Sequence, residues 1–545
     1  MTKGVGFGGV GLENHPRYSL SISPIEGRLR LSFRKMPDDQ GRPAVASASK
    51  LGLPTGRERL TEATMAPSSV RKPSLWTKLA YGFGTVAYGT KDAGLKYFLL
   101  LFYSQVVGMD SRLVSLAILV ALVFDAISDP IVGYWSDNFR SRWGRRHPFM
   151  YAAALPVAVS YYFIWTPPEG WSDEALFGYV LVLAITIRTF ITCYETPSTA
   201  LAPELTDDYD ERSSILSFRG FFGWVGGNAM TVIAFTIVFP AFVTVAIPDG
   251  QFNPDAYAFY GLMGSVAIFG AIMISALGTH HYIPKLRQAP PKREMTLRMI
   301  FKEIYQTVAS GSFFALFSAS LIAFTASGFA AGLSFYFSIY FWGFTSAQIG
   351  LITLGVFLAA VIGGSLAPFV TRKLGKKRGA LTVGLVAFIG LPLPIFLRLI
   401  DVLPENGTPE IFWIIAVANT LDVGLIICYQ ILAMSMMADL VEQGEAKTGN
   451  RSEGLFFSAY TFMRKFGEGF GVVIAGFVLS AVGVAAGATQ GQLSDSTLWN
   501  LGAVYVPVIL GLFLTVLVII SFYKVDRAKH EETVRDLAAR KVASS

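Results

Sequence analysis

The sequence predicts an all-α membrane protein with about twelve transmembrane helices in two six-helix halves and with both termini in the cytoplasm. Two observations carry this prediction. Hydrophobic residues make up 52% of the 545 residues and charged residues only 15%, whereas soluble domains carry about 25% charged residues. Long apolar stretches also recur from about residue 75 onward, and short basic connections separate many of them.

Each apolar stretch is near or above the roughly 20 residues that an α-helix needs to cross a bilayer. The stretches are residues 76–106, 111–135, 148–166, 174–202, 214–245 and 257–283, then 311–341, 346–371, 378–400, 410–438, 453–484 and 498–523. We therefore expect a disordered cytoplasmic extension (1–72), an N-terminal half (73–284), a cytoplasmic linker with an amphipathic helix (285–310), a C-terminal half (311–524) and a cytoplasmic tail (525–545).

The expected extension is polar and rich in Gly, Pro, Ser and Arg, without a sustained period, which is typical of disorder. No apolar run follows its basic start, so it does not match a signal peptide. Met65 begins a Met-Ala-Pro-Ser sequence just before the first apolar stretch. Translation from Met1 and translation from Met65 therefore both agree with the sequence.

The positions of Lys and Arg indicate which connections face the cytoplasm, because these residues accumulate in short cytoplasmic loops. They are concentrated after the second, sixth and eighth stretches, at Arg140, Arg142, Arg145 and Arg146, at Lys285, Arg287, Lys292, Arg293 and Arg298, and at Arg372, Lys373, Lys376, Lys377 and Arg378. Opposite loops such as 166–175 and 248–257 carry none. We therefore expect a multi-pass protein of the plasma (inner) membrane. The net charge of +7 then indicates topology and not nucleic-acid binding.

The two sets of six stretches repeat one another weakly. Gly-Arg-Arg at 144–146 is echoed by Gly-Lys-Lys at 375–377, and Pro-Glu-Leu at 203–205 is echoed by Ala-Asp-Leu at 438–440 at nearly the same offset. Parallel six-helix repeats are the major-facilitator arrangement, in which the solute site lies between the halves near mid-membrane. Basic loops after even-numbered helices can also arise from topology alone.

Two carboxylates in the second stretch are candidates for a coupling-ion site, because ionisable groups inside a bilayer are costly and mark function. Asp125 and Asp129 are four residues apart and so share one helical face. Hard cations such as sodium prefer oxygen ligands, and Glu195 in the fourth stretch offers a third carboxylate. Proton binding is the alternative use of crowded carboxylates. Internal salt bridges to the Lys and Arg residues of other stretches are the structural alternative.

Polar and aromatic residues of the first and fourth stretches are candidates for the solute site. Asp92 is a good hydrogen-bond acceptor for a polyol or sugar, although Lys96, one turn on, offers a simple ion-pair partner. Tyr194 is one of several tyrosines that can stack on the apolar face of a sugar or serve as ordinary packing.

A group of charged residues near the cytoplasmic ends of these stretches resembles an ionic gate. Its members are Arg142, Arg145, Glu204, Asp208 and Arg212. Such pairs can lock the inner mouth in one state and break in the other. A gate of this kind requires a network of ion pairs, because an isolated surface pair contributes under about 1 kcal/mol to stability.

Several segments resemble the glycoside–pentoside–hexuronide:cation symporter family of the major facilitator superfamily. The matching segments are KLAYGFG (78–84), KDAGLKYF (91–98), FDAISDPIVGYWSD (124–137), SRWGRRHPF (141–149), YETPSTALAPEL (194–205), RGFF (219–222) and TFMRK (461–465). The D-A-I-x-D-P pattern followed by S-R-W-G-R-R is quite specific. The likeness covers most of the chain after residue 75 and weakens past residue 300.

The resemblance implies roles for individual residues. Asp125 and Asp129 would bind the coupling cation, with Thr192 and Lys465 nearby. Asp92, Glu195 and Arg219 would contact the solute, with Tyr194 and Lys465 beside them. It also implies alternating access in which the ion raises solute affinity.

The chain departs from the family at two positions. Glu195 stands where the family's best-known member has Asp. Thr199 stands where that member has a Trp that stacks on the sugar, and the loss of this aromatic disfavours a galactoside.

We therefore expect a secondary active transporter, because coupled transport gives the intramembrane carboxylates a role. The expected activity is symport of a sugar or glycoside with sodium or a proton. The alternative is the same machinery acting on a lipid-like or other amphiphilic solute. The sequence lacks the nucleophile, metal-ligand and phosphate-loop motifs of a membrane enzyme. We expect no cofactor besides the coupling ion, and a monomer whose partners are a small solute and the bilayer.

Overall fold

The computed structural model describes residues 18–25, 28–35, 72–206, 208–285, 311–448 and 453–522. Residues Met1–Val70 and Arg71–Ser545 form separate units. The first contains an antiparallel hairpin of β1 (Tyr18–Ile25) and β2 (Arg28–Lys35), with Leu20 opposite Phe33 and Ile22 opposite Leu31. The hairpin differs from the disorder expected for residues 1–72, because apolar residues alternate over both short segments as in strands. The expected linker (285–310) is described only at residue 285, and the expected tail (525–545) lies outside the described residues.

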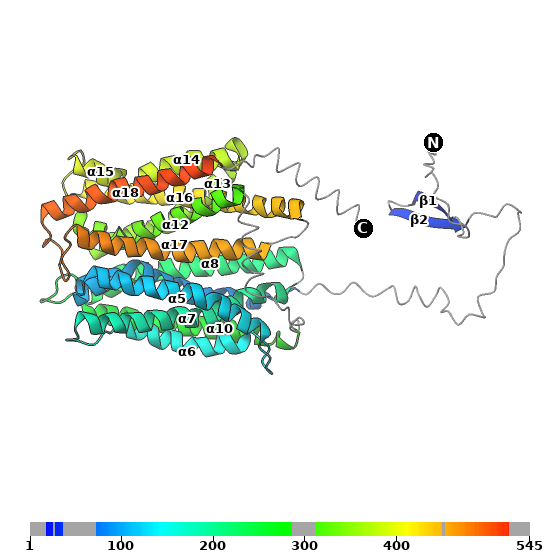
Figure 1. Cartoon of the computed structure of the whole chain (residues 1–545), viewed down its shortest axis with the longest axis horizontal. Helices are drawn as coiled ribbons and strands as arrows, with labels where there is room; N and C mark the ends of the chain where they lie inside the picture. The colour runs from blue at the N-terminus through cyan, green and yellow to red at the C-terminus, as the bar shows by residue number, and fades with distance from the viewer. Residues whose placement is uncertain are drawn as a thin grey trace, which may run out of the picture. The chain divides into compact units, whose positions relative to one another are not determined.

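The N-terminal half is a bundle of helices (Figure 1). Its elements are α2 (Leu75–Phe83), α3 (Thr85–Ala93), α4 (Leu99–Leu101), α5 (Ser111–Asn138), α6 (His147–Phe163), α7 (Asp173–Leu205), α8 (Tyr209–Ile233), α9 (Phe239–Ala241) and α10 (Pro254–His280). Wider π-helical turns interrupt it at Gly94–Phe98, Phe102–Val107 and Ala234–Val238. Such turns are frequent at functional sites, and the first follows Asp92 directly.

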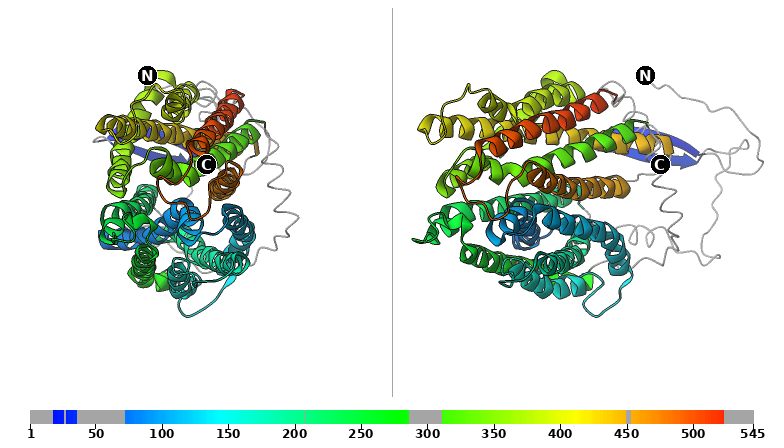
Figure 2. Two further views of the ribbon diagram at one scale, coloured as in Figure 1. Left: turned by 90° about the vertical axis from the view of Figure 1, so that its left-hand side faces the viewer. Right: turned by 60° about the vertical axis from the view of Figure 1, so that its left-hand side comes forward.

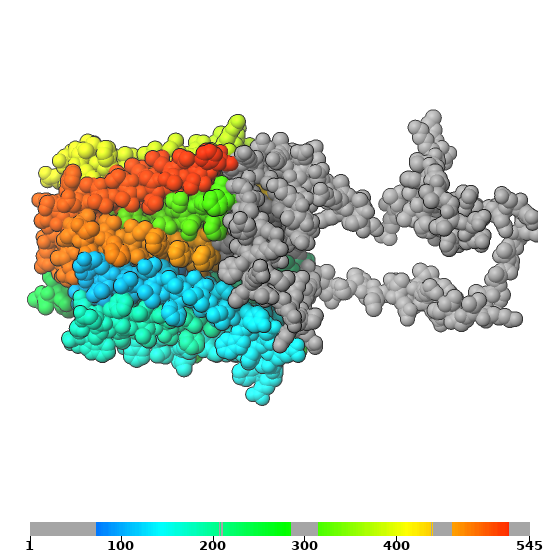
Figure 3. All heavy atoms as spheres, in the orientation of Figure 1, coloured from blue at the N-terminus to red at the C-terminus, as the bar shows by residue number. Residues whose placement is uncertain are grey.

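The C-terminal half is a second helical bundle that lies beside the first (Figures 1 and 3). Its elements are α12 (Gly311–Tyr336), a π-helical turn (Phe337–Phe341), α13 (Ser346–Leu374), α14 (Lys376–Gly390), α15 (Leu393–Leu399), α16 (Pro409–Thr448), α17 (Glu453–Ala481) and α18 (Asp495–Ser521). Viewed along the helices, the two halves form two neighbouring layers (Figure 2).

Nine helical segments within the described ranges are long and apolar enough to cross a membrane. The other expected crossings coincide with the broken helix of α2–α4, with the 17-residue α6, and with α17, which carries three charged residues in its middle. These helices confirm the all-α membrane fold. The number of twelve crossings remains a prediction.

Ion pairs bring the basic connections of each half to one end of the bundle, here called the basic end. Lys78 lies 2.5 Å from Glu211, and Arg146 lies 2.7 Å from Glu204. In the other half Lys376 lies 2.6 Å from Asp439. This grouping agrees with the predicted topology, whose sidedness remains a prediction.

The end of the bundle away from the basic end is held closed by contacts between the two halves. The Gly487 N–H donates to the Ser104 carbonyl at 2.8 Å, and the Ser346 hydroxyl donates to Asp249 at 3.0 Å. The Ser111 hydroxyl donates to the Gly476 carbonyl at 3.0 Å. The two halves are therefore in contact at this end of the bundle, and these contacts close it to a solute.

Close backbone contact between α3 and α8 positions the helix that carries Asp92. A Cβ atom on Gly89 would overlap the Gly223 carbonyl oxygen, which belongs to rigid backbone. Small residues allow this approach between membrane helices. Gly89→Ala is therefore expected to destabilise the protein by about 1–3 kcal/mol, measured as a lower melting temperature in detergent. Gly178→Ala is the control, because its Cβ would meet nothing within 4 Å, and an equal loss in both variants would contradict the packing argument.

Candidate functional site

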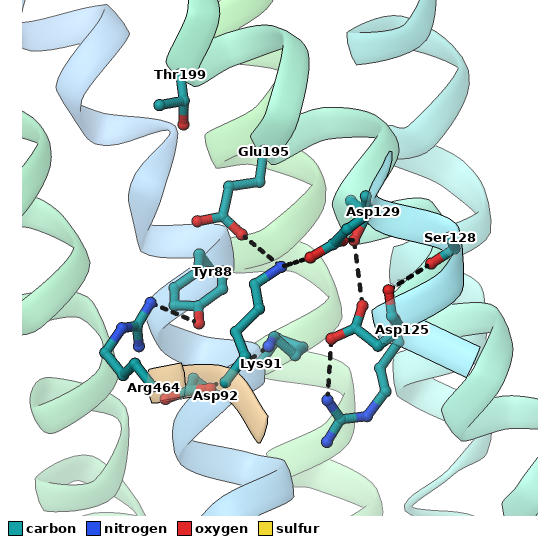
Figure 4. Close-up of polar contacts among 12 residues, drawn as sticks. Tyr88, Lys91, Asp92, Asp125, Ser128, Asp129, Glu195, Thr199 and Arg464 are labelled. Carbon is teal, nitrogen blue, oxygen red and sulfur yellow. Dashed lines mark hydrogen bonds and ion pairs between the residues drawn. The ribbon is translucent and has the colours of Figure 1, made fainter. Parts of the chain in front are cut away.

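The carboxylate pair of α5 is held together by a hydroxyl from α7 (Figure 4). Asp125 and Thr192 are both buried, and Figure 4 shows Asp125 and Asp129 on neighbouring turns of α5. The Thr192 Oγ1 lies 2.7 Å from Asp129 Oδ1 and 3.3 Å from Asp125 Oδ1. One hydroxyl proton serves one acceptor at a time, so the shorter contact to Asp129 is the stronger hydrogen bond. Both predicted carboxylates and Thr192 thus meet at one point.

Two basic side chains neutralise this pair from other helices. Arg188 Nη1 of α7 lies 3.4 Å from Asp125 Oδ2. Lys465 Nζ of α17 lies 2.9 Å from Asp129 Oδ2 and 3.7 Å from Glu195 Oε2. The structural alternative of internal salt bridges is therefore present in this conformation. Lys465 is also the link between the halves, because α17 belongs to the C-terminal half.

A small cavity of about 30 Å³ lies beside Asp125 and not beside Asp129 or Thr192; its charged lining residues are Asp92, Asp125 and Glu468 together with Lys91, Lys96, Arg188 and Lys465. This volume is enough for a water molecule or a small ion. Two carboxylates and a hydroxyl are hard oxygen donors of the kind that sodium prefers. Within the described ranges no three acidic, His or Cys side chains form a ready metal site.

A large cavity of about 790 Å³ lies between the two halves. Its N-terminal wall is polar and charged, and includes Asp92, Lys96, Glu195, Arg219 and Asn228. Its C-terminal wall is mainly apolar, and includes Phe324, Phe335, Ile352, Phe388 and Tyr505. Four residues line both cavities: Tyr88, Asp92, Lys96 and Glu468.

The predicted solute contacts differ in how they face the large cavity. Arg219 donates to Ser198 at 2.7 Å and to Thr199 at 2.9 Å. Thr199, which replaces the family's Trp, thus orients the Arg219 guanidinium. Asp92 lies 3.5 Å from the Lys91 ammonium. These contacts keep Arg219 and Asp92 available as charged groups on the cavity wall.

Tyr194 is a correction to the predicted solute site. Its side chain is fully buried, and the residue is not among those that line either cavity. The hydroxyl lies where a side chain on Gly84 would be. Tyr194 therefore packs α7 against the first helix, which is the alternative considered for it.

Other ionisable residues complete the site. Lys96 pairs with Glu468 of α17 at 3.0 Å and not with Asp92, contrary to the sequence alternative. Arg464 of α17 donates to the Tyr88 hydroxyl at 3.0 Å. We assigned no role to Glu468 or Arg464 from the sequence. Their four-residue spacing on one face of an apolar stretch was the available signal.

The predicted gate residues make their described contacts inside the N-terminal half. Glu204 at the end of α7 binds both Arg145 and Arg146. Arg142 lies over the ring of its neighbour Trp143. These contacts join α7 to the connection between α5 and α6, and none of them crosses to the other half. In this conformation Glu204 braces its own half, and the gate remains a prediction for another state of the transport cycle.

The other two gate residues lie at the start of α8. The Asp208 carboxylate accepts a hydrogen bond from the Glu211 N–H at 3.1 Å. The Arg212 N–H donates to the Asp208 carbonyl at 3.0 Å. These bonds cap the first turn of α8, so the contacts described for this pair are local to that helix.

Glu204→Gln is expected to destabilise the protein by roughly 3–5 kcal/mol, because it leaves two shielded guanidinium groups without their anion. Thermal unfolding in detergent measures the effect. Asp137→Asn is the matched control, since Asp137 pairs with the same Arg146 at 3.6 Å but its side chain is 57% exposed. An exposed pair contributes under about 1 kcal/mol. Equal melting temperatures for the two variants would contradict the bracing role.

The whole membrane part of the chain matches a known transporter family. The family model described as MFS/sugar transport protein covers residues 80–527. The chain belongs to this family. A member of the MFS/sugar transport protein family is a membrane transporter and not an enzyme, which confirms both of those predictions. The match also confirms the resemblance to glycoside–pentoside–hexuronide:cation symporters.

Similar proteins include members that carry different names. An isoprimeverose transporter of Lactiplantibacillus pentosus is 24% identical over 85% of this chain and 92% of its own. A putative glycoside/cation symporter of Escherichia coli (strain K12) is 24% identical over 86% and 95%. A sodium-dependent lysophosphatidylcholine symporter 1 of Gallus gallus is 25% identical over 87% and 93%.

The fold of this MFS/sugar transport protein is also that of solved transporters. An inward-facing bacterial homologue of the iron transporter ferroportin covers 83% of this chain and 99% of its own, with a TM-score of 0.55 and 13% identity. At this identity the likeness supports the fold alone. It confirms the major-facilitator architecture predicted from the six-helix repeat.

Proposed function

We propose that the protein carries a glycoside or related sugar across the membrane together with a cation, sodium or a proton, by alternating access. The observation that carries this proposal is the Asp125–Asp129–Thr192 group, linked by Lys465 of the other half to Glu195 on the solute cavity. The glycoside and cation names of the relatives support it. A single chain suffices, because both cavity walls belong to one chain.

Competition for Asp129 explains how the ion raises solute affinity. A cation bound between Asp125 and Asp129 competes with the Lys465 ammonium, which lies 2.9 Å from Asp129. Lys465 then moves toward Glu195, its other acidic neighbour at 3.7 Å. Because Glu195 lines the large cavity, ion binding changes the charge that the solute meets. By linkage, the solute raises ion affinity by the same factor.

Charged groups of the N-terminal wall would bind the sugar hydroxyls. Asp92 and Glu195 accept hydrogen bonds, and Arg219 donates them. Charge-assisted hydrogen bonds are about twice as strong as neutral ones. The aromatic side chains of the opposite wall would pack on the less polar face of the sugar.

Uptake into proteoliposomes tests the proposal. Labelled isoprimeverose, a simple hexose and lysophosphatidylcholine would be compared under an inward sodium gradient, an inward proton gradient and no gradient. We expect accumulation of a sugar under at least one of the two gradients and none without a gradient. Failure of every sugar, with protein shown to be folded, would overturn the sugar proposal.

The apolar C-terminal wall favours a second candidate, an amphiphilic solute. Its polar head would meet the charged N-terminal wall, and its apolar part would lie against Phe324, Phe335 and Ile352. The lysophosphatidylcholine symporter among the relatives supports this candidate. Gradient-dependent uptake of lysophosphatidylcholine without uptake of any sugar would move it to first place.

A further inference from the structure

Asp422 on α16 is a buried carboxylate that the proposed coupling mechanism does not use. It belongs to the apolar C-terminal wall of the large cavity and is 7% exposed. Both of its carboxylate oxygens are buried without a hydrogen-bond partner. Among the described residues no Lys, Arg or His forms an ion pair with it, whereas Asp125 and Asp129 each have one.

The surroundings of Asp422 contain room for a carboxyl group but no counter-charge. A Cβ atom on Gly390 of α14 would lie 2.7 Å from Asp422 Oδ1, so the missing side chain of this glycine leaves space for the acid. From α13, Gly355 faces α16 at Thr420, and Ala359 faces it at Gly424. Tyr505 of α18, which also lines the cavity, is neutral as a phenol. The described parts of α13, α14 and α18 thus bring no cation to it.

The α14 helix breaks at Gly390, the glycine that faces Asp422. Pro392 and Pro394 follow this glycine. Proline has no N–H, so it cannot bond the carbonyl four residues earlier. The Gly390 carbonyl therefore has no N–H donor at position 394. A neutral carboxylic acid is a donor that can use such a carbonyl, and an ionised carboxylate is not.

We propose that Asp422 binds a proton in this conformation and forms a proton site separate from the cation site on α5. An isolated carboxylate in an apolar wall is far costlier as an ion than as an acid. This inference rests on the proposed function, because a proton on the solute cavity contributes to transport only if the protein is a coupled transporter. It deepens that function by naming the proton as a second ion of the cycle.

The proposed step is a simple protonation. With the cavity open to the far side, water reaches Asp422, a proton from that water binds one carboxylate oxygen, and the group becomes neutral. Closure of the apolar wall keeps the acid neutral. On the basic side the O–H bond breaks when water enters again, and the proton passes to that water.

Infrared difference spectroscopy of the full chain in lipid tests this site without any solute. As the pH is raised, wild-type protein is expected to lose the carbonyl band of a neutral carboxylic acid, and that band should shift in D2O. Asp422→Asn is expected to lack this component. Asp495→Asn, which removes an exposed acid at the start of α18, is expected to keep it. Asp422→Glu keeps a carboxyl group and should move the band. An unchanged band in Asp422→Asn would overturn the proposal.

Uptake measurements distinguish a failure of the proton site from a failure of the proposed symport function. Labelled isoprimeverose uptake by Asp422→Asn should respond to an inward proton gradient about tenfold less than wild type, while exchange of isoprimeverose across the membrane continues. If wild type takes up isoprimeverose and Asp422→Asn responds to the proton gradient as wild type does, the proton site is wrong and the symport proposal stands. If no sugar enters wild type, the infrared result still decides the proton site.

Discussion

Replacement of Asp125 or Asp129 by Asn is expected to abolish accumulation of the solute against its gradient. The substitution keeps the shape of the side chain but removes the negative charge that attracts the cation. Thr192 can still donate to the amide oxygen, and so the local packing is kept. We expect a loss of about a hundredfold in gradient-driven uptake, measured in proteoliposomes with the gradient that drives wild type.

Exchange of labelled for unlabelled solute distinguishes a variant that has lost ion coupling from one that no longer folds. Exchange needs solute binding and the conformational change but no net ion movement, so it should survive at high solute concentration. Asp110→Asn is the matched control on the same helix. Asp110 caps α5 by accepting from the Arg112 N–H at 2.8 Å, and Asn caps helices about as well as Asp. Normal accumulation in Asp125→Asn would remove the basis of the cation site.

Replacement of Lys465 by Gln is expected to have the second-largest effect. Lys465 is the described cation that reaches Asp129 and Glu195 together. Its loss leaves both acids without this partner, at a cost of roughly 3 kcal/mol or more for a shielded pair. Because Lys465 lies on α17, its loss also removes one charge link between the two halves and leaves the Lys96–Glu468 pair. We expect gradient-driven uptake to fall about a hundredfold, with weaker solute binding.

Lys376→Gln provides the comparison for Lys465→Gln. Lys376 also pairs with a carboxylate, Asp439, at 2.6 Å, but its side chain is 30% exposed at the basic end. A partly exposed pair contributes under about 1 kcal/mol, so uptake should stay close to wild type. If both Lys variants lose uptake equally, the effect at Lys465 reports general damage and the competition for Asp129 is wrong.

The sequence predicts the helices of this protein better than the contacts among them. Long apolar stretches identify the bundle because a bilayer imposes length and composition on each helix. The four-residue spacing of Asp125 and Asp129 places them on one face by local geometry alone. The hairpin at residues 18–35 was missed because two short alternating segments carry little signal within a polar region.

Partners between helices depend on distances that no local pattern contains. Lys96 is one turn from Asp92, yet it pairs with Glu468 far along the chain. Tyr194 precedes Glu195, which lines the cavity, but its own side chain points into the packing of α7. The isolation of Asp422 is visible only when the neighbouring helices are in place.

Simultaneous recording of solute-induced sodium and proton movement tests the central claim most directly. Proteoliposomes loaded with a sodium-sensitive and a pH-sensitive dye would receive the sugar that wild type accumulates. We predict that the sugar draws at least one of the two ions inward in wild type, and that this movement falls in Asp125→Asn apart from protons carried by Asp422. Sugar entry with no ion movement in wild type, or undiminished ion movement in Asp125→Asn, would contradict the account.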